Sequence, residues 1–191
     1  MSKYTSYVIL FSYLYGFFEI FMGVRQRLKR KQNVVKSGDK WSIWILLISI
    51  AIGYWLSISA LFSKIGTIKY PVTFFIIGIL TIISGLFIRI TSILTLQQQF
   101  TYTVKKIDDH QLVEKGLYKK IRHPGYLGQL ILFLGVSIAM SNWLSVPCMI
   151  VPVFFGFLYR ITVEEKFLIQ QLGQTYVDYQ KRTNRLIPII F

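Results

Sequence analysis

The stretch Trp41–Phe62, WSIWILLISIAIGYWLSISALF, decides the fold class of this chain. Its 22 residues include no charged side chain. A helix of roughly 20 predominantly apolar residues is long enough to cross the hydrocarbon core of a bilayer. An ordinary soluble domain rarely contains so long an uncharged run. We therefore predict a membrane-spanning helix here.

Four other stretches share this apolar character. Three of them are about 20 residues long with at most one interior charge, and the remaining one, which begins at Pro124, lies at the lower limit of length. The expected spans are Tyr4–Val24, Trp41–Phe62, Pro71–Leu94, Pro124–Met140 and Trp143–Val163. The sequence thus predicts an all-α integral membrane protein with about five transmembrane helices.

The basic residues determine the expected orientation. The chain has 191 residues and a net charge of +14, which in a soluble protein would suggest binding to nucleic acid. Here 18 of the 22 basic residues lie in three segments, Arg25–Lys40, Gln97–His123 and Arg160 to the C-terminus. Basic residues favour the cytoplasmic side. We therefore expect the N-terminus outside, the C-terminus inside, and no nucleic acid partner.

We expect a single membrane domain, residues 1–191, in which residues 1–96 hold three spans. Two inner segments carry most of the polar residues. The connection Gln97–His123 is too long and too apolar for a bare linker, and such loops are usually functional or disordered. The segment Glu164–Thr183 has the apolar periodicity of a helix. A bend in that helix is expected at Gly173, because glycine weakens a helix.

A polar motif, Arg122-His123-Pro124-Gly125-Tyr126-Leu127-Gly128, precedes and enters the fourth span. Proline suits the first turn of a helix, where its missing N–H costs little. The N–H groups of that helix start could bind a carboxylate or a phosphate. A basic anchor at the membrane interface explains the same residues equally well.

A second polar motif, Arg160-Ile161-Thr162-Val163-Glu164-Glu165, follows the fifth span. Arg160 and Glu164 are four residues apart and share a helix face, where they could pair. An interfacial ion pair with a snorkelling arginine is the structural alternative. Two adjacent carboxylates beside a bilayer need partners, however, and this favours a functional role.

The remaining polar residues support weaker inferences. His110 and His123 both fall in the long inner connection, but without nearby cysteines they make a poor metal site, and we predict no bound metal. Glu19 and Arg89 lie toward the inner ends of the first and third spans. Each either snorkels to the interface or lines a cavity.

Five short motifs occur in one order with short gaps. They are Gly116-Leu117-Tyr118, Arg122-His123-Pro124-Gly125-Tyr126-Leu127-Gly128, Glu164-Glu165, Tyr176-Val177-Asp178-Tyr179 and Arg185-Leu186-Ile187-Pro188. Together they resemble the isoprenylcysteine carboxyl methyltransferase family, which belongs with the phospholipid methyltransferases. The resemblance covers about Thr103 to Pro188. The first three spans resemble the family only in being apolar membrane spans, without shared motifs. Gly125 stands where the family more commonly has a small polar residue.

The resemblance implies a membrane methyltransferase that uses S-adenosylmethionine, with the cytoplasmic loop and C-terminal helix capping the cofactor site. Residues 97–191 would then form the cofactor-binding catalytic core. Arg160 and Glu164 occupy the positions that the family uses on the substrate side, and Glu165 is a candidate for either side. The implied cofactor-binding residues are His110, Gln111, Leu112, Val113, Tyr118, His123, Pro124, Gly125, Tyr126 and Glu165.

An arginine on the acceptor side favours an anionic acceptor. Our leading hypothesis is carboxyl O-methylation of a lipophilic, isoprenylcysteine-like acceptor that enters from the bilayer. Methylation of a lipid head group or lipid-like phenol stays open, and an ammonium acceptor would need Glu164 or Glu165 as a base. Membrane sterol-type reductases have a similar RHPxYxG pattern but use NADPH, and a non-catalytic scaffold is the remaining hypothesis. The oligomeric state does not follow from the sequence.

Overall fold

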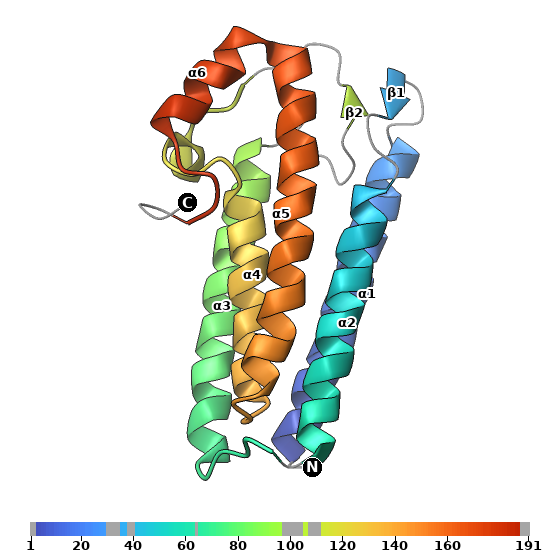
Figure 1. Cartoon of the computed structure of the whole chain (residues 1–191), viewed down its shortest axis with the longest axis vertical. Helices are drawn as coiled ribbons and strands as arrows, with labels where there is room; N and C mark the ends of the chain where they lie inside the picture. Colours follow the sequence, from blue (N-terminus) through green and yellow to red (C-terminus); the bar gives the residue numbers. More distant parts are fainter. Residues whose placement is uncertain are drawn as a thin grey trace.

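The computed structural model describes residues 3–29, 35–37, 41–63, 65–96, 105–106 and 112–187. Long helices run side by side, and the shorter elements gather at one end of the bundle (Figure 1). The helices are α1 (Lys3–Lys29), α2 (Ser42–Ser63), α3 (Pro71–Leu96), α4 (Pro124–Ala139), α5 (Ser145–Leu172) and α6 (Gln174–Arg182), with a 3-10 turn, η2, at Gly116–Lys119. Two short antiparallel strands, β1 (Val35–Ser37) and β2 (Lys105–Lys106), lie at the same end as α6.

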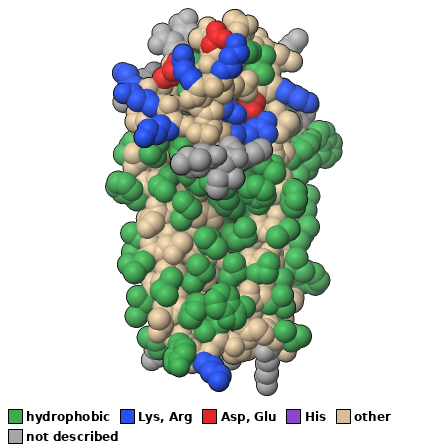
Figure 2. Space-filling model, turned by 60° about the vertical axis from the view of Figure 1, so that its left-hand side comes forward, with side chains coloured by type: hydrophobic (Ala, Val, Ile, Leu, Met, Phe, Trp, Pro, Cys, Tyr) green, Lys and Arg blue, Asp and Glu red, His purple; other side chains and the backbone are tan. Residues whose placement is uncertain are grey.

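The long part of the bundle has the surface of a membrane protein. Hydrophobic side chains cover it, and most charged side chains gather at the end that carries α6 (Figure 2). Among the described helices, α2, α3 and α5 are long and apolar enough to cross a membrane by length and composition. The expected multi-pass, all-helical membrane fold is confirmed, apart from the two short strands. α4 has 16 residues and is the shortest of the expected spans, whereas α1 has 27 but is not among these three helices.

Glycines bring α3 and α4 into backbone contact. A Cβ atom on Gly128 of α4 would lie 2.7 Å from the backbone nitrogen of Arg89, and one on Gly85 of α3 would lie 2.6 Å from the carbonyl oxygen of Gly128. Further along, a Cβ atom on Gly135 would lie 2.6 Å from the backbone nitrogen of Ile82. Close approach of this kind is how helices associate in a bilayer, where apolar burial drives association little.

Small polar residues join α2 to α5. The Ser57 hydroxyl donates to the Ser145 carbonyl, and the Ser145 hydroxyl donates to the Ser57 carbonyl, each at 3.0 Å. Gly156 of α5 packs against Ser49 of α2, where an added Cβ would lie 2.8 Å from the serine side chain. Two tightly packed pairs, α3 with α4 and α2 with α5, therefore form the frame of the bundle.

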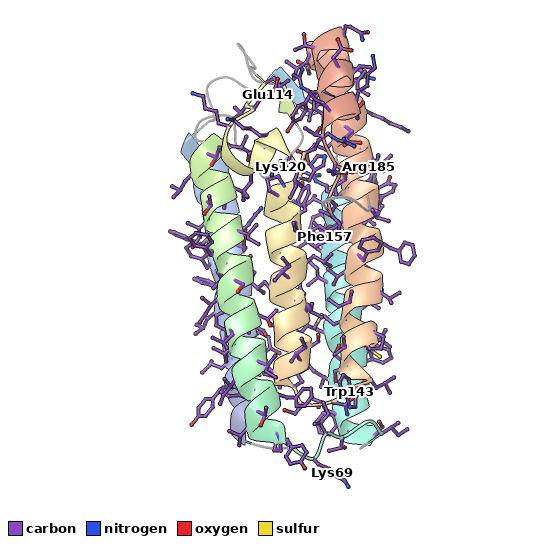
Figure 3. The ribbon with its side chains drawn as sticks, turned by 90° about the vertical axis from the view of Figure 1, so that its left-hand side faces the viewer. Lys69, Glu114, Lys120, Trp143, Phe157 and Arg185 are labelled. Carbon is purple, nitrogen blue, oxygen red and sulfur yellow. The ribbon has the colours of Figure 1, made fainter. Side chains whose placement is uncertain are left out.

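The loops at the end opposite α6 are bound to each other. The Asn142 side chain donates to the Ile65 carbonyl at 2.8 Å and accepts from the backbone nitrogens of Leu144 (2.9 Å) and Ser145 (3.1 Å) at the start of α5. The Trp143 nitrogen donates to the Gly66 carbonyl at 2.9 Å. Figure 3 shows Trp143 and Lys69 at this end. These bonds hold the two helix pairs together at the end of the bundle opposite α6.

The other end is closed by the C-terminal segment. Gly173 ends α5 with a φ of +59°, a conformation that favours glycine, and the chain turns there into α6. The bend expected at Gly173 is therefore present. Beyond α6, Asn184 forms a parallel bridge with Ile121: the Arg122 nitrogen donates to the Asn184 carbonyl at 2.8 Å, and the Asn184 nitrogen donates to the Lys120 carbonyl at 2.9 Å.

Gly128→Ala is expected to destabilise the folded protein by about 1–3 kcal/mol, because the new Cβ meets the α3 backbone and the helices must separate. Gly16→Ala in α1 is the matched control. Nothing lies within 4 Å of a Cβ at Gly16, and alanine favours the helix. Thermal unfolding in detergent measures both, and equal unfolding midpoints for the two variants would contradict the expectation.

Candidate functional site

One buried carboxylate, Glu165 near the C-terminal end of α5, organises the polar end of the bundle. Its side chain is only 5% exposed. Its Oε1 atom accepts from Arg122 Nε at 2.7 Å and lies 3.2 Å from His123 Nε2. Its Oε2 atom accepts from Arg185 Nε at 2.9 Å and from Arg185 Nη2 at 2.8 Å. Glu165 therefore ties α5 to the start of α4 and to the C-terminal segment.

Arg122 extends this network to the end of α6. Its Nη1 atom donates to the carbonyl oxygen of Gln180 at 3.0 Å and also to the carbonyl oxygen of Thr183. Carbonyls at a helix C-terminus lack intrahelical partners, so a guanidinium is a favourable neighbour there. Figure 3 shows Arg185 beside the part of α5 nearest α6. Glu165 thus joins three of the five sequence motifs, and Arg122 links them to the carbonyls at the end of α6.

The start of α4 has the geometry of an anion site. Pro124 occupies the first turn, and the preceding residue, His123, makes no side-chain cap. The His123 ring instead turns to Glu165 and stacks on Tyr126, with ring centroids 5.7 Å apart and an interplanar angle of 23°. The positive end of the α4 dipole is therefore not occupied by the side chain of its own capping residue.

Tyr126 links two charged residues of α5, Arg160 and Glu164. Its hydroxyl donates to Glu164 Oε2 at 2.7 Å and accepts from Arg160 Nε at 3.4 Å. Arg160 is only 3% exposed, and its Nη1 atom also donates to the Ser42 hydroxyl at the start of α2. Among the described residues, Arg160 and Glu164 form no direct ion pair. The pairing that their spacing of four suggested is replaced by a bridge through Tyr126.

Tyr118 lies in η2, next to these groups. Gly116, whose φ is +56°, allows the tight turn that begins η2. The Tyr179 hydroxyl of α6 donates to the Tyr118 carbonyl at 2.6 Å and holds the turn in place. Burial raises the pKa of the Tyr118 hydroxyl, and the charge of Glu164 raises it further. Tyr118 therefore stays a neutral aromatic residue within electrostatic reach of Glu164.

The structure brings most of the expected site residues together. His123, Pro124, Gly125 and Tyr126 open α4, and Arg160, Glu164 and Glu165 face them from α5. Leu112 and Val113 are half-buried in the segment before η2. His110 and Gln111 lie outside the described residues.

Sequence reasoning missed three residues of this network. Arg122 and Arg185 stand inside the recognised motifs, and their positive charges within those motifs were the signal that could have identified them. Ser42 gave no signal, because serines are common in membrane helices and only the packing of α2 on α5 brings it to Arg160. The complete site presents a cation, a carboxylate, aromatic rings and a helix N-terminus at the membrane boundary.

The fold and the site define a class: a multi-pass helical membrane protein with a cluster of buried charged residues at one end of the helix bundle. The profile of the phospholipid methyltransferase family matches residues 73–175. This range is more than half of the 191 residues, so the chain belongs to that family.

Similar proteins confirm the resemblance to isoprenylcysteine carboxyl methyltransferases. The chain is 37% identical over 116 residues to the protein-S-isoprenylcysteine O-methyltransferase of Tribolium castaneum, a match that covers 60% of this chain and 41% of that protein. It is 36% identical over 115 residues to protein-S-isoprenylcysteine O-methyltransferase B of Arabidopsis thaliana, covering 59% and 58%.

A solved structure of a eukaryotic intramembrane Ras methyltransferase, described as isoprenylcysteine carboxyl methyltransferase, is similar with a TM-score of 0.64 and 32% identity. That similarity covers 73% of this chain and 52% of the solved one. The chain spans about half the length of the curated relatives that it matches.

Glu165→Gln is expected to destabilise the protein by about 3–5 kcal/mol, because it leaves buried cationic partners without their carboxylate. Asp178→Asn is the matched control: its partner Lys181 is exposed, and an exposed pair contributes little. Thermal unfolding in detergent is the measurement. A Glu165→Gln variant as stable as the Asp178→Asn variant would show that the Glu165 network does not stabilise the end of the bundle that carries α6.

Proposed function

We propose that this protein is a membrane methyltransferase that uses S-adenosylmethionine to methylate a carboxylate on a lipophilic, isoprenylcysteine-like acceptor. The observation that carries the proposal is the Tyr126 hydroxyl bonded to both Arg160 (3.4 Å) and Glu164 (2.7 Å) beside the start of α4. Membership of the phospholipid methyltransferase family supports methyl transfer. The names of the relatives support a prenylated carboxylate as acceptor.

The groups around the start of α4 suit the methyl donor. The amino acid part of S-adenosylmethionine carries a carboxylate and an ammonium. The first turn of α4, at Pro124 and Gly125, favours the carboxylate, and Glu164 suits the ammonium. The rings of Tyr118 and Tyr126 suit the adenine or the sulfonium. When bound, the donor supplies an electrophilic methyl group.

The connection before η2, from His110 through Gln111, Leu112 and Val113, completes the proposed donor site. Leu112 and Val113 are half-buried and supply apolar surface. Glu165 accepts from Arg122 and Arg185 while it holds the His123 ring, so its carboxylate is engaged by protein groups. We therefore assign Glu165 to positioning and Glu164 to contact with the ligands.

Arg160 is the group that we assign to the acceptor. A carboxylate is already ionised at neutral pH, so it needs no base to attack the methyl group. It needs a cation that orients it in line with the methyl and the sulfur, and a site that excludes water. Arg160, which is 3% exposed, offers a planar donor array for that purpose. Tyr126 and Ser42 hold the guanidinium in place.

An apolar crevice between α1 and α2 supports a lipophilic acceptor. Its volume is about 250 Å³, and it is lined by Ile9, Ser12, Tyr13, Ala51, Tyr54 and Ile58. A row of aromatic contacts leads from Tyr54 to the site: Tyr54 to Phe133 with centroids at 6.1 Å, Phe133 to Phe157 at 6.5 Å, and Phe157 to Tyr126 at 5.3 Å. In the proposed scheme this crevice binds the lipid chain.

The charge distribution supports one orientation for this reaction. The end with α6 and the basic segments would face the cytoplasm, which supplies the water-soluble donor. The N-terminus would then lie outside, and the acceptor would enter from the bilayer. In this scheme residues 1–191 form one membrane domain with residues 97–191 as its catalytic core. A lipidated acceptor and membrane lipids are its partners.

Equilibrium binding to detergent-solubilised protein tests the donor. We expect S-adenosylmethionine to bind and NADPH to bind weakly or not at all, since the described site offers one helix N-terminus rather than a basic pocket for several phosphates. Methyl transfer to prenylcysteine analogues and to lipid extracts then tests the acceptor. Mild base hydrolyses a methyl ester and releases methanol, whereas it leaves a methylated amine intact. Tight NADPH binding without a response to S-adenosylmethionine would overturn the proposal.

Arg160→Ala is expected to reduce methyl transfer at least about 100-fold, because it removes the charge-assisted bonds to the acceptor. Donor affinity should stay within about twofold, since Arg160 is assigned to the acceptor. Arg160→Lys should restore activity only in part, because lysine lacks the planar donor array. Steady-state assays with separate donor titrations measure both effects. Loss of donor binding in Arg160→Ala would instead give Arg160 a structural role.

A further inference from the structure

An ion pair links α1 and α3. Arg89 Nη2 lies 3.2 Å from Glu19 Oε2, and Arg89 Nε donates to Glu19 Oε1 at 3.3 Å. The two side chains are 6% and 15% exposed. Two further groups approach the carboxylate: the Tyr15 hydroxyl donates to Oε1 at 2.6 Å, and Gln129 Nε2 lies 3.5 Å from the same atom. Neither Arg89 nor Glu19 therefore snorkels to the interface.

The pair is one of the few polar attachments of α1. Of the described side chains of α1, Val8 is the one with almost no exposure, and most large apolar side chains of this helix face outward. An ionised pair inside a membrane segment is costly unless it has a role. Attachment of α1 to the bundle is one such role. It does not explain why the Arg89 guanidinium lies beside α4.

Arg89 lies against the first turn of α4. A Cβ atom on Gly125 would lie 3.0 Å from Arg89 Nη1, so the guanidinium sits directly beside the residue that follows Pro124. One turn later, the backbone of Arg89 meets Gly128, where an added Cβ would come within 2.7 Å of the Arg89 nitrogen. Glycine at both positions is what admits this arginine.

The charge of Arg89 also reaches the loop over the site. Burial and the charge of Glu164 raise the pKa of the Tyr118 hydroxyl, and the positive charge of Arg89 acts in the opposite direction. Arg89 and Glu164 thus act on the same tyrosine from different helices. Glu19 lies on the α1 side of Arg89, so the pair forms a dipole whose positive end points to Gly125.

We propose that Arg89 is a positioning residue for the methyl donor: held by Glu19, its guanidinium fixes the first turn of α4 and adds positive potential where the donor carboxylate binds. This inference rests on the proposed function and deepens it. This arrangement requires glycine at position 125, because a side chain there displaces the guanidinium. Arg89 need not touch the donor.

Three variants test the arrangement from both sides: Arg89→Met, Gly125→Ala and the double variant. Each single variant is expected to weaken S-adenosylmethionine binding about tenfold, through loss of the charge or its displacement. The double variant should bind about as weakly as Arg89→Met alone, because a methyl group at position 125 has no guanidinium left to displace. Phe87→Leu, on the exposed face of the same helix, is the matched control and should bind like wild type.

Isothermal titration gives the donor affinities, and thermal unfolding in detergent gives the stabilities. The inference is overturned if Arg89→Met and Gly125→Ala both bind the donor within twofold of wild type, whatever their stability. The Arg89–Glu19 pair would then serve only to attach α1 to the bundle. If Arg89→Met does not fold, Glu19→Gln takes its place, because it releases the guanidinium from its carboxylate without changing a residue assigned to the donor site, and donor affinity within twofold of wild type would then overturn the inference. Absence of donor binding to wild-type protein would instead overturn the proposed function itself.

Discussion

The end of the bundle that carries α6 depends on one buried carboxylate. Glu165 accepts from Arg122 and Arg185 and holds His123, so its partners come from two separate parts of the chain. A buried charge is tolerated only with partners that match it. Because the partners lie just before α4 and beyond α6, satisfying Glu165 forces the C-terminal segment back onto the start of α4. The neighbouring residue, Glu164, is thereby directed to Tyr126.

The bilayer part supplies a rigid frame for this polar end. Glycine contacts between α3 and α4, and reciprocal serine bonds between α2 and α5, fix each pair without relying on apolar burial. The start of α4 therefore keeps a fixed position beside α5. The proposed methyl transfer requires a fixed position of this kind, because nucleophile, methyl group and leaving sulfur must lie in line. The Arg89–Glu19 pair extends the same frame to α1.

In α5 the structure differs from the pairing that the sequence suggested. The spacing of Arg160 and Glu164 correctly predicts one helix face, yet the two side chains meet through Tyr126 from another helix. Local periodicity cannot anticipate a third residue that is 34 positions away from Arg160 in the chain. The break at Gly173 was predictable, since glycine there both weakens a helix and permits a positive φ. The pairing of Glu19 with Arg89 was not, because it joins residues 70 positions apart.

The sequence by itself determined the membrane class, the positions of most helices and the family. Hydrophobic run length, proline and glycine placement and motif order are local properties, and each acts through the backbone within a few residues. Only the tertiary structure decided which charges meet. Glu165, a candidate ligand of the cofactor, is engaged by three protein side chains. Arg89, which was expected to snorkel or to line a cavity, lies beside Gly125. The physical reason is that a charge in a low-dielectric environment takes the partner that packing brings within reach, and packing joins residues far apart in the chain.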